Sequence, residues 1–195
     1  LWATLLVQEP EARLLLKSRQ FADIEVRDRL IAAFEAKGVA KRRLELHGQI
    51  EAREDHFAHY RTIDVALDTF PYNGVTTTFE SLWAGVPVIC MKGHNFNSRC
   101  GESIIRNSKN SYLIAKDIGE YIEKATFLAK DLERLNTIRR TLYENVLSYE
   151  LFDTKKFSKN FSDTLLAINE DYHRKNNKLK LQILNSVSYT HLRAT

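Results

Sequence analysis

The stretch DVALDTFPYNGVTTTFESLWAGVPVI, residues 64–89, decides the fold of this chain. Strand-forming residues at 65–67 lead into the turn sequence at 71–74, PYNG, which is followed by three threonines and an amphipathic helix pattern. The order strand, loop, helix N-terminus is typical of anion-binding sites in α/β proteins, because the first N–H groups of a helix have no partner within it. The stretch therefore predicts an α/β fold with an anion site.

The start and end of this helix are marked in the sequence. Thr77 and Glu80 have the spacing of a capping box, so the helix is predicted to begin at Thr76 or Thr77. Gly85 and Pro87 are expected to end it. A negatively charged ligand would lie where the two threonines and the first free N–H groups converge, whereas ordinary helix capping is the alternative explanation of the same spacing.

Strand and helix patterns alternate along the rest of the chain. Strands are predicted at 14–17, 44–47, 65–68, 88–91 and 112–115, and helices at 1–7, 26–38, 54–62, 76–84, from 98 onward, within 118–147, and from 154 to about 172. This alternation predicts a parallel sheet with helices on both faces, which binds ligands beyond the carboxyl ends of its strands. Lys17, at the end of the first strand, would then meet phosphate or merely end that strand.

Composition narrows the possible functions. The 195 residues suit one α/β domain. The net charge of +4 does not indicate a nucleic-acid partner, since the basic residues are spread among 25 acids. No apolar run approaches the roughly 18 residues of a membrane span, so we expect no membrane partner. Cys90 and Cys100 fit no metal spacing and are interpreted as free thiols, which favours a cytoplasmic location.

Both ends of the chain suggest a fragment with an added tail. Met91 is the only methionine, which is expected of an internal piece of a longer protein. The segment SVSYTHLRA, 186–194, looks like the translated read-through of a sequencing-library adapter. We therefore divide the chain into a domain at 1–174, a polar extension of uncertain origin at 175–185, and a non-native tail at 186–195.

The segments LDTFPYNG, TTTFE and LWAGVPVI, in this order, resemble the C-terminal nucleotide-sugar domain of the O-GlcNAc transferase family, including its plant SPINDLY-type and bacterial members. LLLK at 14–17 and LFDTKKF at 151–157 are similar to family segments too, and the likeness runs from Leu1 to about His173. The resemblance implies a Rossmann-like α/β domain, the C-terminal lobe of a GT-B glycosyltransferase that is metal-independent and inverting. The implied reaction transfers N-acetylglucosamine from UDP-GlcNAc to Ser or Thr of proteins.

The resemblance also implies the roles of individual residues. Thr76 and Thr77 match family positions that hold the diphosphate, and Glu80 matches an acidic ribose contact. His56 stands where the family has a histidine beside the base, and Arg53 where the family has a ribose-binding lysine. Without the resemblance, the helix at 54–62 would be interpreted as a solvent-facing helix with incidental histidines.

Some positions depart from the family or are expected to be structural. Val75 replaces the histidine of animal members, so diphosphate binding would depend more on backbone amides. No D-x-D motif occurs, and no metal or other cofactor is expected. Asn73 and Gly74 are interpreted as the turn that aims the helix, and Asp68 as a buried turn or capping carboxylate.

No catalytic residue is expected in this chain, because the family's donor-site lysine comes from a segment before the residue that is Trp2 here. The opposing GT-B lobe, the tetratricopeptide repeats and the protein acceptor are the implied partners, and the chain alone is expected to be inactive. Three alternatives remain open at this point: a SPINDLY-type transferase that uses GDP-fucose, a nucleotide-sugar epimerase, and a non-catalytic domain that binds a nucleotide or a partner protein.

The tail at 186–195 is predicted to be structurally inert. Deleting it should change the free energy of unfolding by less than about 0.5 kcal/mol, the range of surface changes, in a thermal or urea melt. A clearly larger loss of stability would mean that the tail packs against the protein.

Overall fold

The computed structural model describes the backbone of residues 1–48 and 53–191, and the side chains of 1–48 and 56–179. The chain divides into two compact units, residues 1–152 and 153–195. Each unit is described by itself.

The first unit alternates strands and helices, as the sequence predicts. Its helices are α1 (Trp2–Gln8), α2 (Ile24–Glu35), α3 (Arg53–His59), α4 (Thr76–Trp83), α5 (Cys100–Asn107), α6 (Ile118–Lys130) and α7 (Leu132–Asn145). Its strands are β1 (Leu14–Lys17), β2 (Leu44–His47), β3 (Ala66–Leu67), β4 (Val88–Met91) and β5 (Ile114–Ala115). Short 3-10 helices lie between them, including η3 (Tyr60–Thr62) directly after α3 and η4 (Ser111–Leu113) before β5.

All strand pairs in the described residues are parallel, but they form two separate sheets where one continuous sheet was expected. β1 pairs with β2, with Leu14 opposite Leu44. β4 lies between β3 and β5, with Ala66 opposite Val88 and Cys90 opposite Ile114. Within the described part of the chain, β1 and β3 do not pair, and residues of both strands line one cavity.

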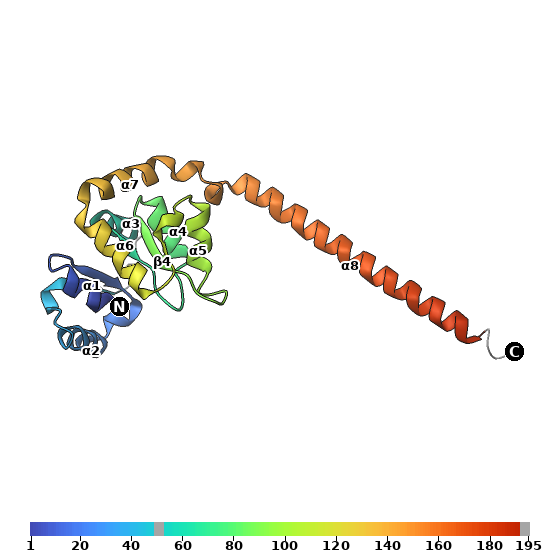
Figure 1. The fold of residues 1–195 in the computed structure, drawn as a ribbon, viewed down its shortest axis with the longest axis horizontal. Coiled ribbons are helices and arrows are strands. Elements are labelled where there is room, and N and C mark those ends of the chain that lie inside the picture. Colours follow the sequence, from blue (N-terminus) through green and yellow to red (C-terminus); the bar gives the residue numbers. More distant parts are fainter. Residues whose placement is uncertain (49–52, 192–195) are drawn as a thin grey trace. The chain divides into compact units, whose positions relative to one another are not determined.

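The main core surrounds β4, whose four residues are all buried. Helix α6 and the pair α4 and α5 flank this strand from opposite sides (Figure 1). Leu82 of α4, Ile105 of α5 and Tyr121 of α6 are fully buried in this core. The Tyr121 hydroxyl donates a hydrogen bond of 2.9 Å to the Asp68 carbonyl at the end of β3, so the core also holds the loop that follows this strand.

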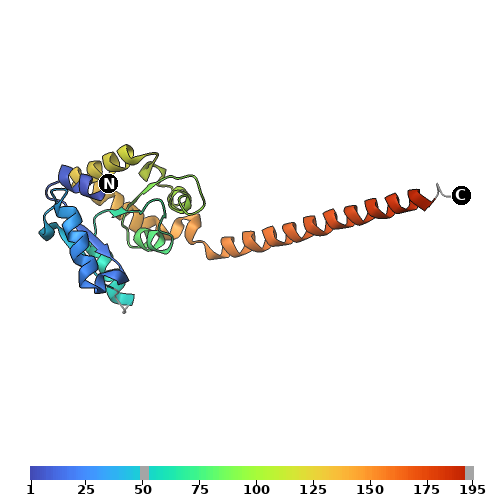
Figure 2. The same ribbon diagram turned by 90° about the horizontal axis from the view of Figure 1, so that it is seen from below.

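A second, smaller core forms near the N-terminus. It joins Leu6 of α1, Leu14 of β1 and Phe34 of α2 with Val39, which is fully buried. In Figure 2 these blue N-terminal segments lie beside one another. The positive φ of Gly38, 82°, ends the turn after α2 and directs the chain back into this core.

The second unit is the single helix α8 (Thr154–His191), drawn without a break in Figure 1. It starts after Asp153, whose Oδ1 accepts a 2.9 Å hydrogen bond from the Lys156 amide, as expected of an N-cap. The helix was expected to end near Tyr172. It continues through both expected boundaries, at 174 and 185, because residues 173–191 contain no Pro or Gly that would end it. No helix in the described residues is long and apolar enough to cross a membrane.

Replacing Leu82 tests the core around β4. The side chain is 0% exposed, so Leu82→Ala should lower the free energy of unfolding by about 2 to 5 kcal/mol through lost burial and a new cavity. Leu165→Ala is the control, because Leu165 lies on α8 and is 51% exposed. Its effect should stay within about 0.5 kcal/mol in the same urea titration. Equal effects of the two substitutions would contradict the assignment of the core.

Candidate nucleotide-sugar site

Helix α4 begins at Thr76, as predicted, but its N-terminus is not closed by a capping box. The N-cap residue is Val75, and no side chain of the described residues caps the helix. Glu80, the predicted second half of the box, turns instead toward α3 and η3. The prediction from spacing was wrong because Glu80 has stronger donors available than a backbone amide.

The first turn of α4 faces solvent and has free donors. Val75, Thr76 and Thr77 are exposed. The Thr78 and Phe79 amides bond back to the Val75 carbonyl, whereas in the described part of the chain no backbone acceptor is paired with the Thr76 or Thr77 amide. Free N–H groups at the positive end of a helix can bind an anion.

Three of the predicted site residues meet beside this helix. Lys17 Nζ, at the end of β1, contacts Nδ1 of His56 on α3. His56 Nε2 lies 2.8 Å from Glu80 Oε2 on α4. Because an ammonium group can only donate, Nδ1 of His56 is assigned as the acceptor. Nε2 then carries the ring proton and donates a hydrogen bond to Glu80. The fold thus joins β1, α3 and α4 through one chain of polar contacts.

Tyr60 is a fourth member of this chain that sequence reasoning left without a role. It lies in η3, is 8% exposed, and its hydroxyl donates to Glu80 Oε2 at 3.1 Å. The same hydroxyl is 3.5 Å from the Thr77 carbonyl. Its position four residues after His56, on the same helical face, was the available signal.

Burial and charge shift the pKa values around this chain of contacts. Burial lowers the pKa of Lys17, and the Glu80 carboxylate partly offsets that shift. Burial, followed by the nearby charge of Glu80, raises the pKa of Tyr60 to about 12. Tyr60 therefore keeps its proton at neutral pH and acts as a hydrogen-bond donor to Glu80.

The loop before α4 is organised by the buried carboxylate of Asp68. Its Oδ1 accepts from the Gly74 amide at 2.6 Å and from the Thr69 amide at 2.9 Å. Its Oδ2 has no partner in the described residues, and a Cβ on Gly101 would lie 2.4 Å from it. Asp68 is thus the turn carboxylate that the sequence predicts, and Gly101 allows α5 to approach it.

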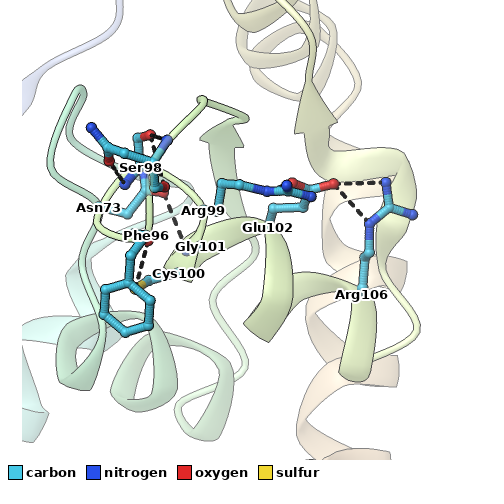
Figure 3. A network of polar contacts seen from close by, with 9 residues as sticks. Asn73, Phe96, Ser98, Arg99, Cys100, Gly101, Glu102 and Arg106 are labelled. Atoms are coloured by element: carbon cyan, nitrogen blue, oxygen red, sulfur yellow. Dashed lines mark hydrogen bonds and ion pairs between the residues drawn. The ribbon is translucent and has the colours of Figure 1, made fainter.

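Asn73 joins the same loop to the start of α5, as Figure 3 shows. Its side chain is fully buried; Nδ2 donates to the Thr69 carbonyl at 2.9 Å and Oδ1 accepts from the Gly101 amide at 3.2 Å. Its own amide donates to the Asn97 carbonyl. Asn73 therefore fixes the turn that aims α4, in agreement with the structural role predicted for it.

Further along α5, the buried Glu102 carboxylate binds two arginines that reach it from opposite sides (Figure 3). Arg99 Nε donates at 3.2 Å and Arg106 Nη2 at 2.9 Å. Burial alone would raise the pKa of Glu102, but hydrogen bonds and charge from Arg106 and Arg99 lower it below its ordinary value. Arg99 is thus engaged in anchoring α5.

A cavity of about 1430 Å³ opens next to the N-terminus of α4 and extends between β1 and β3. Lys17, Tyr60, Gly74 and Thr77 are among its lining residues. Its volume exceeds the roughly 300 to 1,000 Å³ of typical small-molecule pockets. The cavity as a whole is therefore large enough to accommodate a nucleotide.

Of the seven predicted site residues, six lie in the part of the structure with described side chains. Lys17, His56 and Glu80 are connected, and Thr76, Thr77 and Val75 form the exposed start of α4. The side chain of Arg53, at the first position of α3, lies outside the described residues.

Comparison with known proteins identifies the family. Residues 1–161 match glycosyl transferase family 41. The chain belongs to this family. A probable UDP-N-acetylglucosamine--peptide N-acetylglucosaminyltransferase SPINDLY of Solanum lycopersicum is 36% identical over 159 residues, which are 82% of this chain and 17% of that protein.

Two further relatives support the same family assignment. A UDP-N-acetylglucosamine--peptide N-acetylglucosaminyltransferase of Caenorhabditis elegans is 32% identical over 116 residues, 60% of this chain and 10% of that protein. A solved structure of a Thermobaculum terrenum O-GlcNAc transferase mutant superposes with a TM-score of 0.79 at 37% identity, covering 84% of this chain and 31% of that one. The predicted fold, an α/β lobe of a GT-B glycosyltransferase, is confirmed.

Asp68 gives the family 41 domain a predicted pH dependence. Burial raises the pKa of its carboxyl from 3.8 to about 6, although hydrogen bonds from the Gly74 and Thr69 amides oppose this shift. The folded state then binds the proton more tightly than the unfolded chain, so this contribution to stability is present below about pH 4 and is lost as pH rises through about 6. Asp68→Asn mimics the protonated form. Above about pH 6 this substitution should therefore raise the free energy of unfolding by about 1 to 3 kcal/mol relative to the parent.

The test compares the free energy of unfolding of the two proteins by urea titration at several pH values. The difference between Asp68→Asn and the parent should grow in favour of the variant between about pH 4 and pH 6. Asp28→Asn, an exposed position on α2, controls for removing one carboxylate charge. A difference that stays constant with pH would contradict the raised pKa.

Proposed function

We propose that this chain is the donor-binding lobe of a protein O-GlcNAc transferase, which transfers N-acetylglucosamine from UDP-GlcNAc to Ser or Thr of proteins without a metal. The observation that carries the proposal is the meeting of Lys17, His56 and Glu80 beside the exposed start of α4. This arrangement offers a cation, an acceptor carboxylate and free backbone donors within one site. A nucleotide diphosphate has chemical groups that match each of them.

The diphosphate of the donor would bind at the start of α4. The free amides of Thr76 and Thr77 and the hydroxyls of both residues can donate to phosphate oxygens. Lys17 would add a positive charge from the end of β1. Fixed donors that face the developing charge of the leaving diphosphate stabilise it as the glycosidic bond breaks, which is how the site would contribute to inverting transfer.

The nucleoside would lie toward α3. Glu80 would accept from ribose hydroxyls, since its carboxylate is held there by His56 and Tyr60. His56 has both ring nitrogens engaged, so it would contact the base through the edge or face of its ring. Arg53 is proposed as a second ribose contact. At Val75, whose side chain has no donor, the backbone alone would contribute to diphosphate binding.

The complete reaction needs more than this chain. The tomato relative is about six times as long as the part that matches, and the opposing lobe, tetratricopeptide repeats and protein acceptor are part of the proposal. So is a cytoplasmic location, which the free cysteines Cys90 and Cys100 favour.

A second candidate is the transfer of fucose from GDP-fucose to Ser or Thr. It requires the same diphosphate and ribose contacts, and the observation that favours it is Val75, where animal O-GlcNAc transferases carry a histidine. Membership of a glycosyltransferase family favours both transferases over an epimerase or a non-catalytic binding domain.

Thr76→Ala and Glu80→Ala should each weaken UDP binding by about 1 to 3 kcal/mol, the range for a hydrogen bond to a charged group. Because Thr76 does not cap α4, Thr76→Ala should leave stability nearly unchanged, whereas Glu80→Ala removes the acceptor of His56 and Tyr60 and should lower the free energy of unfolding. Titration calorimetry or ligand-observed NMR with the 195-residue chain measures the affinity for UDP and for GDP.

Thr137→Ala, at an exposed position of α7, is the control and should bind UDP like the parent. Unchanged UDP affinity in the variant that combines Thr76→Ala with Glu80→Ala would reject this site. Selective binding of GDP over UDP would move the function to the fucosyl candidate.

A further inference from the structure

Tyr60 is the one member of the polar chain to which the sequence analysis assigned no role. It is 8% exposed and contacts Glu80 from η3, whereas His56 contacts the same carboxylate from α3. We propose that Tyr60 is a positioning residue that fixes the Glu80 carboxylate so that its second oxygen selects nucleotides with a complete ribose. This proposal rests on the proposed function and extends it to a determinant of specificity.

The contacts of Glu80 are asymmetric. Two donors converge on the same carboxylate oxygen: His56 Nε2 at 2.8 Å and the Tyr60 hydroxyl at 3.1 Å. A carboxylate oxygen has about two acceptor sites, so these donors saturate Oε2. Oε1 receives no hydrogen bond from the described residues. It is therefore the oxygen that can accept from a ligand hydroxyl.

Two donors from different directions also restrict the side chain. A glutamate has three rotatable bonds and loses considerable entropy when it is held in one conformer. His56 lies on α3 and is partly exposed, with 22% of its side chain accessible, so by itself it leaves the carboxylate free to swing about their contact. Tyr60, packed edge-on against the His56 ring at 5.7 Å between centroids, prevents that motion.

Tyr60 is also tied to α4 itself. Its hydroxyl is 3.5 Å from the carbonyl of Thr77 in the first turn, and its raised pKa keeps the phenol protonated as a donor. The residue thus links the ribose-binding carboxylate to the helix turn proposed for the diphosphate. The Glu80 side chain is 23% exposed, so a bound nucleotide that lacks the hydroxyl facing Oε1 would cover this acceptor without pairing it, which is the physical basis for rejecting that nucleotide.

The test measures the discrimination between UDP and its deoxy forms by Tyr60→Phe. With the 195-residue chain, the parent should bind UDP at least about tenfold more tightly than 2′-deoxy-UDP or 3′-deoxy-UDP. In Tyr60→Phe the ratio should fall to within about threefold, with the affinity for the deoxy nucleotide unchanged. GDP and its deoxy forms replace the uridine series if GDP is the nucleotide that binds.

Tyr121→Phe is the matched control, because it removes another buried phenol hydroxyl, one that donates to the Asp68 carbonyl at 2.9 Å. It should lower stability and leave the discrimination ratio unchanged. If Tyr60→Phe weakens binding of UDP and of both deoxy forms equally, Tyr60 only stabilises the fold and the proposal is overturned.

A readout without ligand separates this proposal from the proposed function. Side-chain carbon-carbon couplings of Glu80, measured by NMR on the isotope-labelled chain, should report a single conformer in the parent and averaging in Tyr60→Phe. Failure of every nucleotide to bind would reject the proposed function, and with it the ribose selection. Fixed couplings in both proteins would reject the positioning role alone.

Discussion

The hydrogen bonds that the Asp68 carboxylate accepts from the Thr69 and Gly74 amides set the path of the chain between β3 and α4. The turn they close places the exposed first residues of α4 at the carboxyl end of β3, where an α/β fold binds its ligands. Asn73 extends this constraint to α5, and the Tyr121 hydroxyl ties it to α6. Burying a charged carboxylate with one unpaired oxygen costs free energy. At neutral pH, where Asp68 is charged, its burial therefore reduces the stability of the domain.

The candidate site lies beside this loop and combines residues from three different elements. Lys17, His56 and Glu80 come from β1, α3 and α4, and their contacts form one chain that ends at Glu80 in the second turn of α4. Because the donors of Tyr60 and His56 meet on one oxygen of Glu80, the site holds its acceptor in a fixed direction before a ligand arrives. Such preorganisation reduces the entropy that binding must otherwise lose.

Most secondary-structure elements could be predicted from the chain because their signals are local. The strands at 14–17, 44–47 and 88–91 coincide with the structure, and Gly38 and Gly85 end helices with positive φ, as expected. The capping box failed because Glu80 forms contacts with residues 20 and 24 positions earlier in the chain, which no local spacing reveals. The end of α8 was misjudged because nothing in the sequence stops that helix after Tyr172.

The sequence by itself determined the α/β order, the start of α4 and, through resemblance, a family that the comparisons confirm. It also pointed to Lys17, His56 and Glu80 as separate candidates. Only the tertiary structure decided that these three side chains form one chain of contacts, that Tyr60 joins them, and that the strands of the described residues form two sheets. The physical reason is that periodicity and capping act over a few residues, whereas hydrogen bonds between distant side chains depend on how the elements pack.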